Sequence, residues 1–491
     1  MPPHSRSSGE FGAEAAGTAF ATWRKSSMIA YMTGSELVSA YLSRELSPVE
    51  VLRETLDRVE KLNETFGVFI TISPEVALKQ ALASERRYAD QAPASAVDGL
   101  PLTVKDIVAT RGVRTTYGSL IWRDNVPDTD APIVERLASA GTVLLGKTNT
   151  PEKAWKAESE NRLIGPTRNP FDRDRTAGGS SGGAAAAAAL GLGVLHQASD
   201  GAGSVRIPAS FCGVFGFKPS ASLIPQAPPS AAGDISQLGS ITRTVRETAL
   251  FLDVTAGLDS RDRWSYNTNN DYLGSCDGGV RGLRIAWSPD LGYAWVEPEV
   301  LQLVSAAVKT FEELGASVEI AHPAVDDPWD ILDTIWATAH AGMHLDDFEE
   351  LRSLMDPGRV KVIEHGRSIR GDTVVAMQLK RNEYYESWRR FMDDYDVLLT
   401  PTVPITSFEL GTDAPRQVNG SRPAYLEWTP FTYPFNLTGF PAATVPVGRT
   451  SAGLPVGLQI VGGFRADAVV LRAAATFEQA RPWDFHGLDI S

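Results

Sequence analysis

The chain has 491 residues, of which 43% are hydrophobic and 22% are charged, which is the composition of an ordinary soluble globular protein. Its 46 basic and 60 acidic side chains give a net charge of −14, which argues against a nucleic-acid partner because phosphate binding needs a basic face. Two distant cysteines, Cys212 and Cys276, argue against a disulfide framework, and no apolar run reaches transmembrane length. We therefore expect a cytoplasmic protein that binds neither nucleic acid nor a membrane.

Residues 1–30 lack the charged start and the apolar core of a secretory signal, and we expect them to form a poorly ordered extension. Two amphipathic helices are predicted next, over residues 34–46 and 47–63, with Ser47 as the N-cap of the second. Beyond them, short β-type runs alternate with helical patterns. This alternation predicts a single α/β domain over residues 31–491, with a large mixed β-sheet sandwiched between helices.

The predicted strands cover residues 68–72, 100–107, 142–149, 192–199, 214–220, 283–289, 317–323, 396–402, 442–448 and 457–463. The further predicted helices cover residues 131–141, 184–189, 244–257, 297–315 and 467–480. Residues 326–394 interrupt the alternation, because they are helical in pattern and rich in aromatic side chains. This helical insertion is either a cap over a pocket or a second layer of core.

Residues 176–193 place Ser180 and Ser181 between two glycine pairs and then continue into alanine. The letters GGSSG formally match the nucleophile elbow of Ser-His-Asp hydrolases, but no histidine further along the chain lies in a setting that recommends it as the base. The stretch is not a phosphate-binding loop either, because no Gly-Lys-Ser or Gly-Lys-Thr follows.

A second serine, Ser204, also lies among small residues, which would let consecutive backbone N–H groups point into one concavity and hold an oxyanion. Lys105 lies inside a strongly apolar β-type run, where a charged ammonium is costly. It is therefore a candidate for the missing base. An exposed edge lysine paired with Asp106 is the alternative interpretation.

The chain resembles the amidase signature family in motifs that occur in the family's order and at its usual intervals. These motifs are GLPLTVKD, GKTNTPE, GPTRNPFDRDRTAGGSSGG, GSVRIPASFCGVFGFKPS, and YPFNLTGFPAATVPVG followed by GLPVGLQIVGG. The resemblance extends from about Ser35 to Trp483. It implies the amidase signature fold and a Ser-Ser-Lys triad, in which Ser204 is the nucleophile, Ser180 the bridging serine and Lys105 the base.

The same resemblance implies that Ser181 helps to orient the lysine and that the peptide bond at Ser180 is cis. The apolar neighbours of Lys105 would remove its charge by desolvation. The resemblance also implies that no metal or other cofactor is required. Four consecutive backbone N–H groups would form the oxyanion hole, those of Gly201, Ala202, Gly203 and Ser204. Ala202 replaces a glycine found in most relatives, so its methyl group is expected to narrow the floor of the site. Asp200 and Arg206 flank the nucleophile and are expected to brace its loop.

Four aromatic side chains are candidates for lining an apolar acyl or aryl pocket: Trp155, Trp329, Trp336 and Tyr433. We therefore predict a hydrolase that cleaves the C–N bond of small hydrophobic or aryl carboxamides through an acyl-enzyme, as a monomer or homodimer. A carbamate or nylon-oligomer hydrolase of the same family is one alternative, and a non-catalytic ligand-binding protein on an amidase scaffold is another. Ile207 stands where the tRNA-dependent amidotransferase subunits usually have glutamine, which makes ammonia delivery to a partner less favoured.

Overall fold

The computed structural model describes residues 29–485 and residue 488. The predicted N-terminal extension therefore lies outside the described residues, apart from its last two positions. Within the described part of the chain, no helix is both long and apolar enough to cross a membrane.

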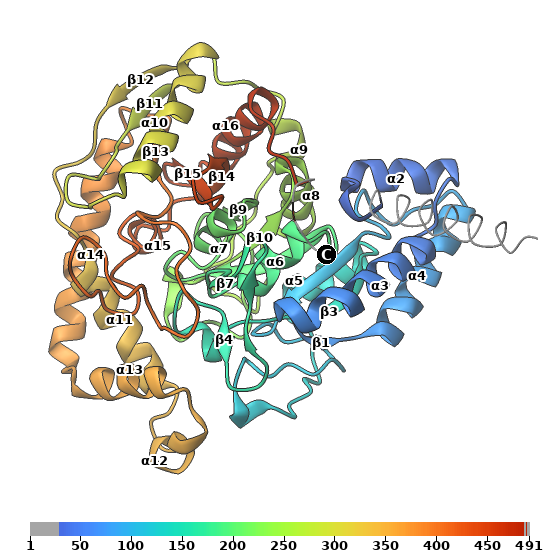
Figure 1. Ribbon diagram of the computed structural model, residues 1–491, viewed down its shortest axis with the longest axis horizontal. Helices are drawn as coiled ribbons and strands as arrows, with labels where there is room; N and C mark the ends of the chain where they lie inside the picture. The colour runs from blue at the N-terminus through green and yellow to red at the C-terminus, as the bar shows by residue number, and fades with distance from the viewer. Residues whose placement is uncertain (1–28, 486–487, 489–491) are drawn as a thin grey trace, which may run out of the picture.

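One mixed sheet of eleven strands runs through the molecule, with helices packed against it (Figure 1). It contains all ten predicted strands, so the predicted α/β architecture is confirmed. In spatial order the strands are β1 (Phe69–Ile72), β3 (Val143–Thr148), β2 (Pro101–Lys105), β8 (Leu195–Asp200), β10 (Gln237–Thr242), β9 (Phe215–Lys218), β14 (Ala442–Arg449), β15 (Pro455–Gly462), β13 (Val397–Pro401), β11 (Arg284–Trp287) and β12 (Ser317–Ile320).

Strand β10 is absent from the sequence prediction. Its residues, QLGSIT, contain glycine and serine at the centre and show no alternation of apolar and polar side chains. The strand is buried along its whole length, and it pairs antiparallel with both β8 and β9 in the interior of the sheet. Gly239 is required there, since a Cβ atom at this position would lie 2.3 Å from the carbonyl oxygen of Phe217.

The helices outside the insertion include all seven that the sequence predicts, together with α4, α7, α9 and α15. Their bounds are α2 (Gly34–Ser43), α3 (Pro48–Phe66), α4 (Pro74–Ala89), α5 (Pro132–Ser139), α6 (Gly182–Ala189), α7 (Arg206–Phe211), α8 (Val245–Thr255), α9 (Tyr272–Ser275), α10 (Pro298–Glu313), α15 (Pro434–Leu437) and α16 (Asp467–Ala480). Ser47 caps α3 as predicted, since its side chain accepts a hydrogen bond from the backbone N–H of Glu50.

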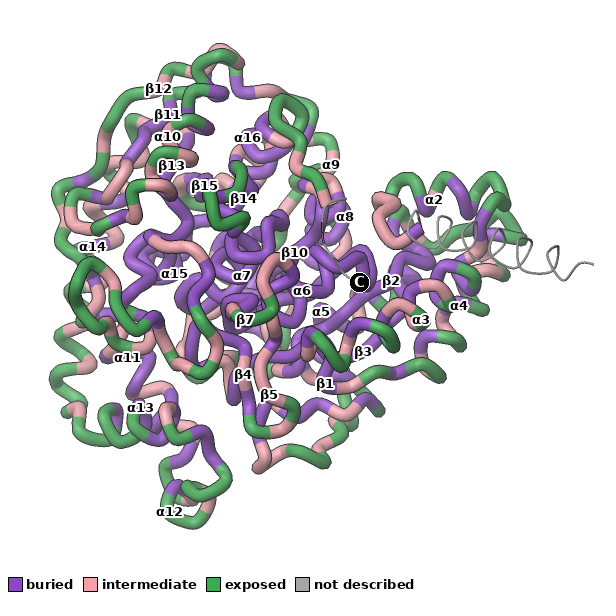
Figure 2. The backbone as a smooth tube through the Cα atoms, in the orientation of Figure 1, coloured by how far each residue is buried: buried purple, intermediate pink, exposed green. Residues whose placement is uncertain are grey.

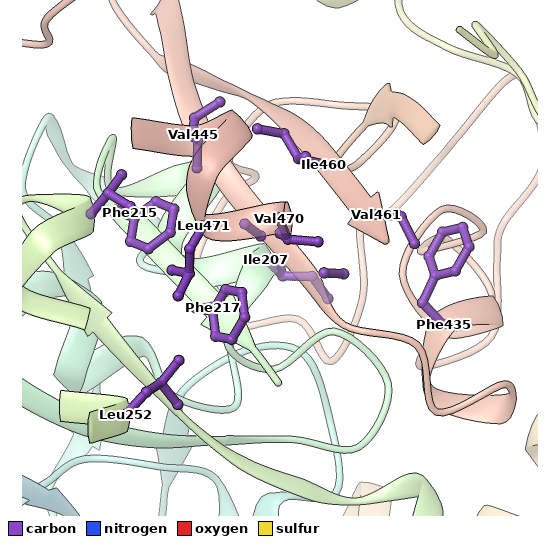
Figure 3. Packing of buried hydrophobic residues seen from close by; sticks show 14 of the residues in the cluster. Ile207, Phe215, Phe217, Leu252, Phe435, Val445, Ile460, Val461, Val470 and Leu471 are labelled. Carbon is purple, nitrogen blue, oxygen red and sulfur yellow. The ribbon is translucent and has the colours of Figure 1, made fainter. Parts of the chain in front are cut away.

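The centre of the molecule is buried, whereas the surface of the outer helices is largely exposed (Figure 2). Side chains from α7, β9, β14, β15 and α16 pack in one apolar cluster (Figure 3). Ile207 places α7 inside this cluster, and α6 is buried at every residue. These two short helices follow directly after the two serine-bearing loops, so the core holds both loops in place.

The insertion, residues 326–394, forms helices α11 (Trp329–Gly342), α12 (Phe348–Leu351), α13 (Pro357–Ser368) and α14 (Gly371–Phe391) along one edge of the molecule (Figure 1). Two buried contacts attach it to the core. Trp336 Nε1 in α11 donates a hydrogen bond to the carbonyl oxygen of Trp155 over 3.1 Å. Arg359 in α13 forms an ion pair with Glu152 over 3.1 Å.

Two glycine-to-alanine substitutions test how tightly α6 is packed. Gly183 lies in α6, where a Cβ atom would approach the backbone nitrogen of Asn149 to 2.4 Å, whereas Gly342 in α11 has no atom within 4 Å of that position. Both substitutions raise helix propensity. We expect Gly183→Ala to lower the free energy of unfolding by about 1–3 kcal/mol through overpacking. Gly342→Ala should raise it by up to about 1 kcal/mol.

Urea unfolding midpoints of the two variants and the parent protein would measure this difference. A Gly183→Ala variant as stable as Gly342→Ala would contradict the close approach of α6 to the strand end at residue 149.

Candidate active site

Lys105 is the last residue of β2, and its side chain has no solvent exposure. Its Nζ atom lies 2.7 Å from Ser180 Oγ, 2.9 Å from Ser181 Oγ and 3.0 Å from Ser199 Oγ. The lysine is therefore not an exposed edge residue. It is not paired with Asp106 either, since that carboxylate accepts hydrogen bonds from the hydroxyl and amide of Thr116 and from the amide of Gly118.

Burial lowers the pKa of Lys105 well below its ordinary value of 10.5, and the negative charge of Asp200 only partly opposes this. No carboxylate among the described residues accepts a hydrogen bond from Lys105 Nζ. The amine is thus surrounded by hydroxyl groups, which satisfy its hydrogen bonds without stabilising its charge as strongly as a carboxylate would.

The glycine-rich loop at 178–182 packs against the backbone of residues 157–158. A Cβ atom on Gly179 would lie 2.4 Å from the backbone nitrogen of Glu158, so no larger residue fits there. The Gly179–Ser180 peptide bond is cis, as the resemblance implied. Ser180 and Ser181 are both fully buried and face Lys105.

Ser204 lies directly before α7 and retains 4% exposure, whereas Lys105 and Ser180 have none. Its carbonyl oxygen accepts a hydrogen bond from the N–H of Ser181 over 3.1 Å, so the two serine-bearing loops are in direct contact. The Oγ atom of Ser204 makes no hydrogen bond with any described residue. Of the three residues predicted to form the triad, Ser204 is therefore the only one with any solvent exposure.

The four backbone amides predicted to form the oxyanion hole differ in their partners. The N–H of Gly203 donates to Asp200 Oδ1 over 2.7 Å. The N–H groups of Gly201, Ala202 and Ser204 donate to no acceptor among the described residues. Gly203 also takes the left-handed φ of this loop, +117°, and Ala202 does not. An alanine therefore fits at position 202 without backbone strain.

Asp200 and Arg206 form a fully buried ion pair beneath this loop. Arg206 donates through Nε and one terminal nitrogen to the two carboxylate oxygens, each over 2.9 Å, and its guanidinium also binds Asn436 and Gln459. Burial alone would raise the pKa of Asp200, but the charge and hydrogen bonds of Arg206 lower it below its usual value. The carboxylate is ionised, and it holds the amides of Gly203 and Val205.

The four predicted pocket aromatics occupy different positions. Trp336, in α11, packs against the loop that carries Ser204, because a Cβ atom on Gly201 would be 2.7 Å from its ring. Trp155 is also buried, with 1% exposure, and lies at the base of a surface groove of 720 Å³ beside α13. The Trp329 ring is half-buried and packs 6.2 Å from the ring of Tyr433. Tyr433 is completely buried, and its hydroxyl donates to Asp327 over 2.6 Å.

Ser199 is the site residue that sequence reasoning missed. It lies in β8 immediately before Asp200, and its hydroxyl is the third neighbour of Lys105 Nζ. The position of Ser199 in the sequence could have indicated it. A polar side chain near the end of a predicted buried strand, next to a proposed site, needs a hydrogen-bond partner. Strand β8 pairs parallel with β2, which brings Ser199 beside Lys105.

Comparison with known proteins gives consistent results. The Amidase family model matches residues 50–471. An acylamidase from Rhodococcus erythropolis is 40% identical over 461 residues, which covers 92% of this chain and 96% of that protein. One of the subunits of the glutamyl-tRNA(Gln) amidotransferase of Dehalococcoides mccartyi (strain CBDB1) is 32% identical over 470 residues, covering 90% of this chain and 95% of that one.

Two solved structures have the same fold. One is a bacterial aryl acylamidase of the amidase signature family, with a TM-score of 0.88, 32% identity, and coverage of 94% of this chain and 98% of that chain. The other is 6-aminohexanoate cyclic dimer hydrolase in complex with substrate, with a TM-score of 0.85, 28% identity, and coverage of 94% and 99%.

The buried pair beneath the loop yields a stability prediction. Asp200→Asn and Arg206→Met each leave the opposite charge buried without its partner, so each should lower the free energy of unfolding by about 3–5 kcal/mol. The double variant carries neither charge and should be at least about 1 kcal/mol more stable than the less stable single variant. Urea unfolding near neutral pH measures all four proteins. Strictly additive losses in the double variant would show that the two charges do not stabilise each other.

Proposed function

The chain belongs to the amidase signature family and is an enzyme that hydrolyses amide C–N bonds, and from this premise we propose that the reaction proceeds through an acyl-enzyme on Ser204. Ser204 Oγ attacks the amide carbonyl while Ser180 accepts its proton and passes its own to Lys105 Nζ. The oxyanion binds the free N–H groups of Gly201, Ala202 and Ser204. Lys105 then returns the proton through Ser180 to the departing amine, and water releases the acyl group by the same relay.

The observation that carries this proposal is the set of three hydroxyls around the buried amine. A neutral amine has two N–H bonds and one lone pair, so it donates to only two of them. Ser181 Oγ donates its single proton to the carbonyl oxygen of Ser199 over 3.1 Å, and must therefore accept from Lys105. If Ser199 Oγ accepts the second N–H, the lone pair is left for the hydroxyl of Ser180, the closest of the three.

The relay also requires Ser180 and Ser204 to exchange a proton. Their loops are in contact through the Ser181 N–H, and catalytic hydrogen bonds commonly shorten only when the substrate is bound. We therefore expect substrate binding to bring Ser180 Oγ and Ser204 Oγ within hydrogen-bond distance.

For the substrate, we propose small hydrophobic or aryl carboxamides. The Trp336 ring against Gly201 supplies an apolar surface next to the proposed oxyanion hole, and two of the similar proteins are an acylamidase and an aryl acylamidase. Cyclic or linear nylon-oligomer amides are the second candidate, supported by the similarity to 6-aminohexanoate cyclic dimer hydrolase. Ammonia transfer is less favoured, because Ile207 is buried against the nucleophile loop where the amidotransferase subunits usually have glutamine.

Two substitutions test the proposed nucleophile and base. Ser204→Ala removes the attacking oxygen and Lys105→Met removes the base while keeping most of the side-chain volume. Each should lower kcat/KM for para-nitroacetanilide by at least about 10³-fold, the scale of triad deletions. Ser210→Ala is a matched control, since this buried serine lies in α7 close to Ser204 but outside the site.

Circular dichroism and urea unfolding would verify that each variant is folded, and a fluorophosphonate probe should label the parent protein at Ser204. Parent-level turnover in a folded Ser204→Ala variant would sink the assignment. Tight ligand binding with neither turnover nor labelling would favour the non-catalytic scaffold.

The pH dependence tests the state of the lysine and the role of Ser199. Only neutral Lys105 accepts a proton, so kcat/KM should rise with pH through its lowered pKa and reach a plateau well below 10.5. Ser199→Ala removes an acceptor that stabilises the ammonium more than the amine, so the acidic limb should move to lower pH. We expect kcat to fall about tenfold, because the lone pair loses its orientation.

Ser199→Thr keeps the hydroxyl and should restore both the rate and the position of the limb. If Ser199 only supports the fold, Ser199→Ala will lower stability and leave the pH profile unchanged.

A further inference from the structure

The turn that precedes α15 contacts the loop of Ser204, although the two are far apart in the sequence. Thr432 lies in this turn and is fully buried. Its hydroxyl oxygen lies 2.8 Å from the carbonyl oxygen of Ala202 and 3.1 Å from that of Thr429. The proposed mechanism assigns no step to Thr432, so this contact with the nucleophile loop has no role in it.

The hydroxyl of Thr432 donates its proton to Ala202. A hydroxyl group can donate only one hydrogen bond. The carbonyl oxygen of Thr429 already accepts the backbone N–H of Thr432 over 3.1 Å, whereas that of Ala202 accepts from no other group in the described chain. Because a buried carbonyl group needs a donor, the shorter of the two contacts is the one that receives the proton.

The peptide group between Ala202 and Gly203 is held at both ends. It is trans, so its C=O and N–H point in opposite directions. Thr432 binds the carbonyl oxygen, and Asp200 Oδ1 accepts the N–H of Gly203 over 2.7 Å. The packing is also close, since a Cβ atom on Gly203 would lie 2.4 Å from Thr432 Oγ1. The orientation of this peptide plane is therefore fixed.

A second side chain of the same region acts on the preceding part of the loop. Nδ2 of Asn436, in α15, lies 2.9 Å from both the carbonyl oxygen and Oδ1 of Asp200. The N–H of Gly201 belongs to the same trans peptide as that carbonyl, so it points away from Asn436. Asn436 also binds Arg206, so its replacement would disturb the buried ion pair. The side chain of Thr432 has no contact with that pair and can be tested separately.

From these contacts we propose that Thr432 is a positioning residue for the oxyanion hole. The peptide that it holds lies between two of the proposed donors, the N–H groups of Ala202 and Ser204. By fixing the carbonyl oxygen of Ala202, the hydroxyl keeps both N–H groups aligned with the oxygen that becomes negative during the attack. Thr432 itself bonds to no reacting atom. The inference rests on the proposed function and adds to it a residue outside the triad.

Thr432→Val tests the hydroxyl, because valine keeps the shape of the side chain and removes the donor. We expect kcat for para-nitroacetanilide to fall about tenfold and KM to change by less than about twofold, since the amides bind the oxygen mainly in the transition state. The rate constant for fluorophosphonate labelling of Ser204 should fall by a similar factor, because the phosphonyl oxygen needs the same donors. Thr432→Ser keeps the hydroxyl and should restore both rates to within about threefold of the parent protein.

Thr429→Val is the matched control. Thr429 lies just before the same turn and is equally buried, and its hydroxyl donates to the carbonyl oxygen of Leu426 over 2.8 Å. That carbonyl group is not part of the loop of Ser204. We expect Thr429→Val to lower the urea unfolding midpoint, as Thr432→Val does, and to leave kcat and the labelling rate at the values of the parent protein.

A Thr432→Val variant with a lower unfolding midpoint but with the kcat and labelling rate of the parent would overturn the inference, because the hydroxyl would then serve stability alone. Equal losses of kcat in the two valine variants would overturn it too, since loosening of the whole turn would be the cause. Both results leave hydrolysis at Ser204 intact. If Thr432→Val does not fold, Thr432→Cys, whose thiol is a weak donor, is judged by the same two outcomes. A parent protein that neither hydrolyses the anilide nor takes up the label would instead refute the proposed function, and the inference with it.

Discussion

The amine of Lys105 is buried at the end of a central strand, and the protein satisfies it with three hydroxyl groups instead of a carboxylate. The nearby negative charge of Asp200 could stabilise the ammonium form of Lys105, which cannot accept a proton as the proposed base. Its carboxylate is instead held on both oxygens by Arg206 and by the amides of the nucleophile loop. The ion pair thus braces the loop and limits the attraction of Asp200 for the proton on Lys105, so that desolvation dominates the pKa of the lysine.

The arrangement of hydroxyls depends on backbone segments that approach more closely than side chains allow. Gly179 lies against the backbone of Glu158, and Gly183 lies against that of Asn149. Gly203 supplies a left-handed turn and commits its amide to Asp200. The glycines around Ser180 and Ser204 are therefore packing requirements of two loops that lie next to each other. The alanine helix α6 follows the same rule, because it is buried on all sides.

Much of the fold could be predicted because most strands are apolar runs bounded by turn residues. Strand β10 could not, since its glycine and serine are explained only by contact with β9 on one side and β8 on the other. At the site, the motifs gave Lys105, Ser180 and Ser204, which the structure brings together. They gave no indication of Ser199, whose role depends on the parallel pairing of β8 with β2, or of the engaged amide of Gly203. Tyr433 was an expected pocket residue, but its hydroxyl is bound to Asp327 and its ring is in the core.

The residues proposed to carry the chemistry and the aromatic ring proposed to contact the substrate come from different parts of the chain. Lys105 and the serines lie on β2, β8 and the loops before α6 and α7, all of which are buried in the sheet and its helices. Trp336 comes from α11 of the insertion and lies against Gly201. The buried Arg359–Glu152 pair and the Trp336–Trp155 hydrogen bond fix the insertion against the core. Exposed residues such as Lys361 in α13 lie on this outer layer, so they can vary without disturbing the hydroxyls around the lysine. Substrate preference can therefore diverge within this fold while the proposed proton relay stays the same, because none of the hydrogen bonds around Lys105 Nζ involves the insertion.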